Sequence, residues 1–97
     1  MNDSNYPWFI LVPRRNNIKE LYQLSKEDRI QLVSETDEVA KRLSNHFQAA
    51  KMNIAALGNI VPQLHVHVIV RRENDASWPN PVWNGAPTIL YLSLIHI

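Results

Sequence analysis

The segment from residue 63 to residue 71 constrains the fold more than any other part of this chain. Its aliphatic side chains stand at every second position: Leu64, Val66, Val68 and Val70. Because successive side chains of a β-strand point to opposite faces, this alternation predicts a strand with one face against a hydrophobic core. The opposite face then carries Gln63, His65, His67 and Ile69. We therefore expect two imidazoles side by side, about 6.5 Å apart along the strand.

A short strand and a long helix precede this segment. The apolar run 8–12 lies between two prolines, which favours a buried strand over a helix. After it, Ser25 begins an N-capping pattern, and apolar residues recur at helical spacing. These residues are Leu32, Thr36, Val39, Ala40, Leu43 and Phe47. Together they predict an amphipathic helix from about Lys26 to about Phe47.

Residues 52–57 form a second apolar segment, and the turn dipeptide Gly58-Asn59 follows it. We expect this segment to pair with residues 64–71 as a β-hairpin. The order strand, helix, strand, strand then predicts an α+β fold, in which one long amphipathic helix packs on a face of an antiparallel sheet. A length of 97 residues allows one domain.

The composition excludes several classes of protein. Ten Lys and Arg against nine Asp and Glu leave a net charge of +1, which argues against a nucleic-acid partner. The chain has no cysteine, so disulfides, thiolate metal sites and cysteine nucleophiles are excluded. No segment reaches the about 20 consecutive apolar residues that span a bilayer, and the first residues lack the pattern of a signal peptide. We therefore expect a cytoplasmic protein with no membrane partner.

The two imidazoles of residues 65 and 67 allow three interpretations. They could lie on a solvated strand face by chance. They could be two ligands of a metal site, which needs a third ligand; the candidates, none at a diagnostic spacing, are His46, Glu73, Asp75 and His96. They could also be a nucleophile and its assistant in catalysis on a small group such as a phosphate. The spacing alone leaves all three open.

A longer stretch around the two histidines resembles the signature of the histidine triad (HIT) superfamily of nucleotide hydrolases and transferases. It reads Asn53-Ile54-Ala55-Ala56-Leu57-Gly58-Asn59-Ile60-Val61-Pro62-Gln63-Leu64-His65-Val66-His67-Val68-Ile69. The segment 9–15, which ends in a proline and a basic pair, is similar to a family strand, and the helix follows at the expected place. The motif Gln63-x-His65-x-His67, together with Trp78-Pro79-x-Pro81-Val82-Trp83, resembles the motifs of a bacterial branch of HIT-like or diadenosine tetraphosphate hydrolase-like proteins.

The resemblance covers about residues 2–85. Relatives have an additional N-terminal segment that walls the nucleobase pocket. We therefore assign residues 1–87 to a HIT-like domain that is incomplete at its N-terminus, and residues 88–97 to an unmatched apolar tail. The tail is interpreted either as a final strand or, as we favour, as unrelated sequence at the end of a fragment.

The resemblance implies a role for each matching residue. Gln63 takes the place of the first histidine of the motif, His65 that of the second, which is the family's nucleophile, and His67 that of the third. Asn53 matches a residue that contacts substrate phosphate or ribose, and Gly58 matches a glycine before the catalytic strand. His65 would attack the α-phosphorus and form a nucleotidyl-histidine that water cleaves. This scheme requires no metal and no cofactor.

The implied function is hydrolysis or transfer at a phosphate-linked bond of a purine nucleotide or dinucleotide. The implied partners are that substrate and a second copy of the chain in a homodimer. A non-catalytic nucleotide-binding module is an alternative, because Gln63 cannot titrate as a histidine does. A metal-binding domain is another.

Other aromatic and basic residues have simpler interpretations. Trp78 and Trp83 either hold a proline-rich loop against the domain, which we favour, or close a nucleotide pocket by stacking. We expect Trp8 to be a core or interface residue. Arg71 and Arg72 could attract phosphate, but as charges at the end of a strand we expect them to be solvated.

Overall fold

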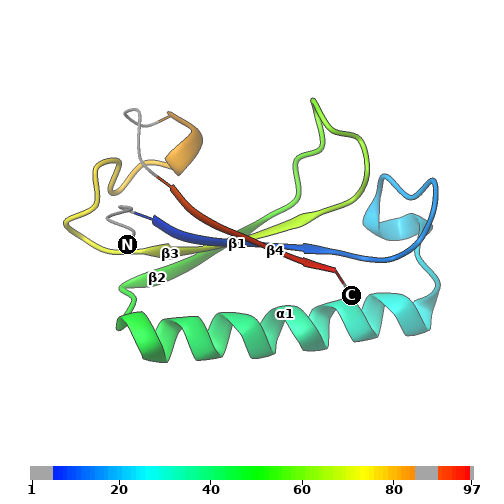
Figure 1. The fold of residues 1–97 in the computed structure, drawn as a ribbon, viewed down its shortest axis with the longest axis horizontal. Coiled ribbons are helices and arrows are strands. Elements are labelled where there is room, and N and C mark those ends of the chain that lie inside the picture. Colours follow the sequence, from blue (N-terminus) through cyan, green and yellow to red (C-terminus); the bar gives the residue numbers. More distant parts are fainter. Residues whose placement is uncertain (1–5, 85–89, 97) are drawn as a thin grey trace.

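The computed structural model describes residues 6–84 and 90–96, and its elements follow the predicted order (Figure 1). They are β1 (Tyr6–Val12), the 3₁₀ helix η1 (Leu21–Gln23), α1 (Lys26–Phe47), β2 (Lys51–Ala55), β3 (Val66–Arg71), the 3₁₀ helix η2 (Val82–Asn84) and β4 (Leu90–His96). The helix has the predicted bounds. The first strand and the hairpin are also confirmed, although β3 begins two residues later than the sequence pattern indicates.

The strands form one sheet in the order β2-β3-β1-β4. The central strand β3 pairs antiparallel with both β2 and β1, so that Ala55 and Ile10 both lie opposite His67. These three strands and the helix confirm the predicted α+β class. β4 lies parallel to β1 at the edge, so residues 90–96 form a final strand, which was one interpretation of this segment. The favoured interpretation, unrelated sequence at the end of a fragment, stays a prediction. Residues 88, 89 and 97 lie outside the described residues, and the domain boundary at residue 87 stays a prediction.

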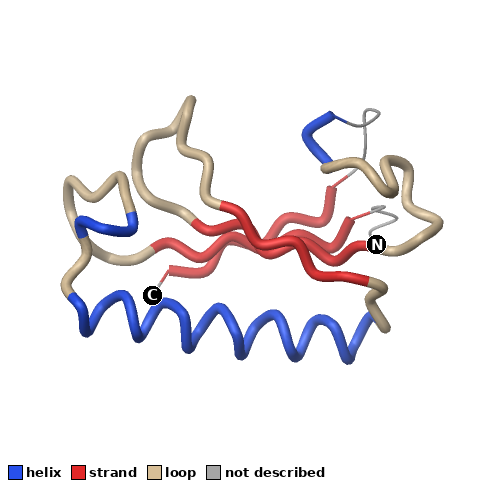
Figure 2. Tube along the Cα trace, turned by 180° about the vertical axis from the view of Figure 1, so that it is seen from behind, coloured by secondary structure: helices blue, strands red, loops and turns tan. Residues whose placement is uncertain are grey.

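α1 lies along one face of the sheet (Figure 2). It begins where the Ser25 side chain accepts the backbone N–H of Asp28, as the capping pattern predicts. It ends at Gln48, which adopts a left-handed conformation with φ of 52°. Leu32 of its apolar stripe forms a buried aliphatic cluster with Leu11, Leu24, Leu64, Val66 and Val68, and Val39, Ala40 and Leu43 of the stripe pack against this cluster. Among the helices in the described ranges, none has the length and apolarity needed to cross a bilayer.

The sheet face opposite α1 is covered by the chain that follows β3. Tyr6, Ile69 and Val82 form a second buried cluster there, against which Trp8 packs. All residues of β3 are therefore buried, on both faces of the sheet. The interpretation of the histidine-bearing face as a solvated surface is wrong, because the segment 72–84 folds back over it.

Candidate functional site

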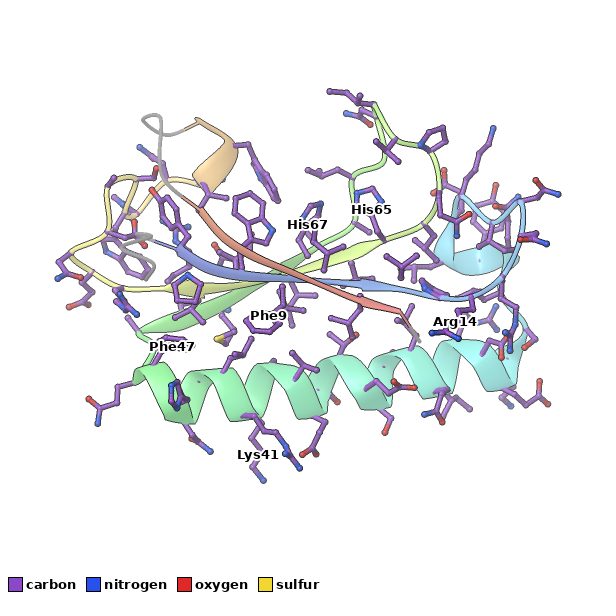
Figure 3. All side chains as sticks on the ribbon, viewed as in Figure 1. Phe9, Arg14, Lys41, Phe47, His65 and His67 are labelled. Atoms are coloured by element: carbon purple, nitrogen blue, oxygen red, sulfur yellow. The ribbon has the colours of Figure 1, made fainter. Side chains whose placement is uncertain are left out.

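The two histidines lie on the sheet face that points away from α1 (Figure 3). His67 is on β3, and His65 immediately precedes that strand. Their ring centroids are 4.9 Å apart and their planes meet at 71°. The predicted convergence of the two imidazoles is thus confirmed, and it follows from the pleat of the strand.

A backbone carbonyl orients the ring of His65. Its Nδ1 lies 2.7 Å from the carbonyl oxygen of Gln63. A carbonyl oxygen only accepts hydrogen bonds, so Nδ1 carries the proton and Nε2 of the neutral ring keeps its lone pair. The side-chain amide of Gln63 instead donates to the carbonyl of Arg15 at 3.3 Å. Gln63 therefore orients His65 through its main chain.

His67 is more enclosed than His65, with 9% of its surface exposed. Trp8 and Trp83 both lie edge-on to its ring, at centroid distances of 5.5 and 5.1 Å. The indole Nε1 of Trp8 donates to Nδ1 of His67 at 2.8 Å. Burial, and next the neighbouring His65, lower the pKa of His67 below its ordinary value. Both effects favour the neutral form of the ring.

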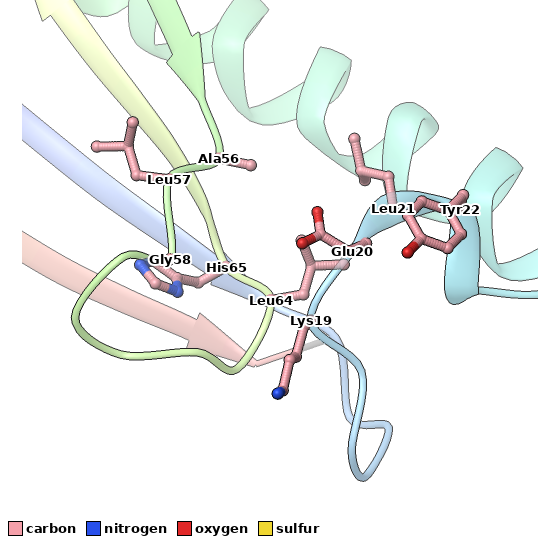
Figure 4. A pocket seen from close by; sticks show the side chains of 9 residues that line it. All are labelled: Lys19, Glu20, Leu21, Tyr22, Ala56, Leu57, Gly58, Leu64 and His65. Atoms are coloured by element: carbon pink, nitrogen blue, oxygen red, sulfur yellow. The ribbon is translucent and has the colours of Figure 1, made fainter.

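His65 borders three cavities, two of which also border Gly58. One, of about 400 Å³, is bounded by the tryptophans Trp8 and Trp83, both histidines and the loop residues Leu57, Gly58, Asn59, Ile60 and Val61. The other, of about 300 Å³, lies between the start of the same loop and the region of η1, and Lys19 and Glu20 contribute charged side chains to it (Figure 4). Both volumes are in the lower part of the range of small-molecule sites.

Gly58 borders both cavities and shapes the loop between β2 and β3. Its φ of 77° is in the left-handed region, which a residue with a Cβ rarely adopts. The loop can therefore turn back beside His65. This gives a physical reason for a glycine at the position that the family motif predicts.

Asn53 lines a different cavity from the two histidines. Its Oδ1 accepts a hydrogen bond of 2.7 Å from Nη1 of Arg71. This cavity, of about 450 Å³, has Ile69, Val82 and Trp83 among its lining residues. Asn53 shares the sheet face of His67, since its partner in the register is Ile69. Its contact with a substrate stays a prediction.

The expectation that Arg71 is solvated is wrong. The side chains of Arg71 and Asp75 are 2% and 1% exposed and form an ion pair of 2.8 Å. Nη2 of Arg71 also donates to the carbonyl of Asn80, and its guanidinium lies 5.5 Å from the centre of the Trp78 ring. A buried charge of this kind is tolerated because it is paired with a carboxylate and each of its three nitrogens donates at least one hydrogen bond.

Asp75 organises the turn that carries the chain back over the site. Its carboxylate accepts the backbone N–H groups of Arg72, Ser77 and Trp78 in addition to the guanidinium. Burial alone would raise the pKa of Asp75, but the hydrogen bonds from Arg71 and the backbone outweigh it and hold that pKa below its ordinary range. No local sequence pattern reveals this pair, because a separation of four positions brings opposite charges together on a helix, whereas residues 71–75 are the end of a strand and a turn.

The tryptophans have two different roles. Trp78 packs on Arg71, which confirms that it holds the loop against the domain. Trp83, on η2, is 41% exposed and lies beside Trp8 and His67 at the mouth of the cavity of about 400 Å³. Sequence analysis missed the place of Trp8 in the site, because a wholly apolar run does not reveal which side chains face which way.

A metal centre finds little support in the described residues, which contain no group of three His, Cys, Asp or Glu side chains able to hold an ion. Of the predicted third ligands, Asp75 is occupied by Arg71, and His46 lies against Phe47 at the end of α1. Glu73 is exposed in the turn after β3. The side chain of His96 lies outside the described part of the chain.

Comparisons with known proteins agree with the family resemblance. The HIT domain family matches residues 1–74. A histidine triad protein from Bradyrhizobium japonicum is 46% identical with a TM-score of 0.87, and the match covers 94% of this chain and 68% of the other. A histidine triad (HIT) protein from Sinorhizobium meliloti 1021 is 52% identical with a TM-score of 0.86, and the match covers 94% of this chain and 67% of the other.

A histidine triad protein from Marinobacter aquaeolei VT8 is 47% identical with a TM-score of 0.85, and the match covers 92% of this chain and 65% of the other. The chain thus spans about two thirds of the length of these three proteins. None of the curated proteins matches the chain.

Proposed function

Since this chain belongs to the HIT domain family, we propose that it is a nucleotide hydrolase or transferase that acts at a phosphate-linked bond of a purine nucleotide or dinucleotide. Family membership itself points to a nucleotide-related function. The observation that carries the finer proposal is the 2.7 Å contact between Nδ1 of His65 and the Gln63 carbonyl, which leaves Nε2 as a nucleophile.

The reaction follows from the orientation of the two rings. Nε2 of His65 attacks the α-phosphorus, and the bond from phosphorus to the leaving group breaks, with the electron pair going to the leaving group. A nucleotidyl group is then bound to His65 through a P–N bond. Water attacks the same phosphorus and gives up a proton to solvent, the P–N bond breaks with its electron pair returning to Nε2 of His65, and a nucleoside monophosphate leaves. His67, 4.9 Å away between ring centroids, donates a hydrogen bond to a phosphoryl oxygen as charge builds up on it.

The cavity of about 400 Å³ beside His65 and His67 suits the nucleoside part of such a substrate. Its lining is mostly apolar, and Trp83 offers a partly exposed aromatic surface beside His67. An aromatic ring of this kind stacks on a nucleobase with little sequence preference. The nucleotide is the partner that we propose for this site, in a cytoplasmic protein.

A non-catalytic nucleotide-binding module is the second candidate, and the side chain of Gln63 favours it. This amide bonds to the Arg15 carbonyl and cannot exchange a proton with His65 as a third imidazole could. Such a module would bind AMP in calorimetry and give no product over hours.

We also propose a homodimer, as the family resemblance implies. α1 exposes Ile30 and Val33, which are three residues apart and so share one side of the helix. An exposed apolar patch of this kind is a common site of association. A monomer in light scattering at micromolar concentration would contradict the proposal.

The decisive experiment is His65→Ala with adenosine phosphoramidate and diadenosine polyphosphates as substrates. We expect turnover to be lost while the circular dichroism spectrum and thermal midpoint stay those of the wild type. His46→Ala is the matched control, since His46 is an exposed histidine at the far end of α1. Equal turnover in His65→Ala and wild type would refute His65 as the nucleophile.

A further inference from the structure

The bond between Trp8 and His67 determines which nitrogen of His67 can donate. An indole N–H is a donor only. Because Nε1 of Trp8 lies 2.8 Å from Nδ1 of His67, that nitrogen must accept. We propose that Trp8 is a positioning residue that holds His67 as the neutral tautomer with its proton on Nε2. This inference rests on the proposed function, in which His67 must donate to a phosphoryl oxygen.

The surroundings of Trp8 prevent its N–H from turning to another acceptor. Trp8 lies on β1 opposite Ile69, two residues before Ile10, which lies opposite His67. Its ring packs against the buried cluster of Tyr6, Ile69 and Val82 and contacts Trp83 edge-on at 5.3 Å. A side chain held on several sides loses little further freedom when it makes a hydrogen bond.

The two histidines are thereby held in opposite tautomers. The Gln63 carbonyl requires a proton on Nδ1 of His65, whereas the Trp8 indole requires a lone pair on Nδ1 of His67. Nε2 of His65 consequently carries a lone pair, and Nε2 of His67 carries a proton. One ring can attack phosphorus and the other can donate to its oxygen without any prior proton transfer between them.

The same bond opposes the doubly protonated form of His67. A proton on Nδ1 would face the indole N–H of Trp8, and the hydrogen bond would be lost. The ring faces Trp8 and Ile10 from β1, Ala55 from β2, Trp83 from η2 and its neighbour His65. Of these described neighbours only His65 titrates. Burial of the ring acts in the same direction as the indole.

The test is Trp8→Phe in the full chain, which keeps an aromatic ring and removes the N–H. Long-range ¹H–¹⁵N correlation spectra of the ligand-free protein report the tautomer of each histidine. We expect wild-type His67 to carry its proton on Nε2, and Trp8→Phe to show a mixture of tautomers with a raised midpoint of titration. Trp83→Phe is the matched control, because it removes an indole that also contacts His67 and should leave the tautomer unchanged.

Turnover gives the second readout. If Trp8 acts through His67, kcat of Trp8→Phe falls by about tenfold, the value of one ordinary hydrogen bond, while KM changes less. A shifted tautomer with unchanged kcat would overturn the link to catalysis. Wild-type His67 protonated on Nδ1, or the same tautomer in wild type and Trp8→Phe, would overturn the role of Trp8.

The spectra need neither substrate nor activity, so they separate a failure of this inference from a failure of the proposed function. If Trp8→Phe does not fold, the wild-type spectrum still decides the tautomer, and a Nδ1 proton on His67 is then sufficient to reject the role of Trp8.

Discussion

The two faces of the sheet are held by different kinds of contact. The face under α1 is buried by a cluster of six aliphatic side chains. On the other face, polar side chains are enclosed and form hydrogen bonds in pairs: Arg71 with Asp75, Tyr6 with Ser77, and Trp8 with His67. Aliphatic packing tolerates exchange for other apolar groups of similar volume, whereas a buried polar group without its partner is costly. We therefore expect the face that carries the histidines to tolerate substitution less well than the face that packs on α1.

The largest effect is expected when the buried ion pair is broken. Asp75→Ala leaves the Arg71 charge buried and three backbone N–H groups without their acceptor. We expect the free energy of unfolding to fall by about 3–5 kcal/mol in urea denaturation. Glu73→Ala, at an exposed position of the same turn, is the control and should leave the unfolding midpoint unchanged. A loss in Asp75→Ala that is no greater than in this control would show that the pair is not structural.

A smaller effect is expected on the helix face of the same strand. Val68 is fully buried under α1, and Val68→Ala should cost about 2 kcal/mol of unfolding free energy through lost packing. Because its side chain points away from the histidines, kcat should stay at the wild-type value. A large fall in kcat at an unchanged unfolding midpoint would contradict the separation of the two faces.

The capping bond of α1 gives a still smaller effect. Ser25→Ala removes the acceptor of the Asp28 N–H and should cost about 1 kcal/mol, whereas Ser25→Gly should cost only a few tenths. Urea denaturation of both variants checks this order. Equal losses in the two variants would mean that the side-chain bond does not stabilise the helix.

The smallest effect is a pH dependence that originates on the site face. Burial lowers the folded-state pKa of His67, with a smaller contribution from His65. The unfolded chain therefore binds a proton more readily, so the contribution of His67 to stability is complete above its unfolded pKa of about 6.5 and is lost as the pH falls through the folded-state value. We expect wild-type stability to fall more steeply than that of His67→Gln as the pH is lowered below about 6.5. Parallel curves would contradict this.

Periodic patterns predicted the parts of the fold that depend on repetition. The helix from Lys26 to Phe47, its Ser25 cap and the alternation in β3 follow from spacings of three, four and two residues. The convergence of His65 and His67 follows from the same alternation, so the centre of the candidate site was accessible from sequence.

Contacts between distant segments could not be predicted in this way. The uniformly apolar run of β1 does not show that Trp8 faces His67, since that depends on the register with β3. The burial of Arg71 depends on how the chain turns after the strand and on the acceptors that the turn supplies. Likewise, the parallel pairing of β4 with β1 joins segments too far apart in sequence for a local pattern to specify.

The indoles of Trp8 and Trp83 both contact the imidazole of His67, so their fluorescence is an intrinsic probe of the site. The ring centroids of Trp8 and Trp83 are 5.3 Å apart, and both side chains border the cavity of about 400 Å³ beside the histidines. A ligand that binds in this cavity would displace water from the partly exposed Trp83. Because the wavelength of indole emission depends on the polarity around the ring, the emission would shift. Occupancy of the cavity could therefore be followed by fluorescence titration of the unlabelled protein.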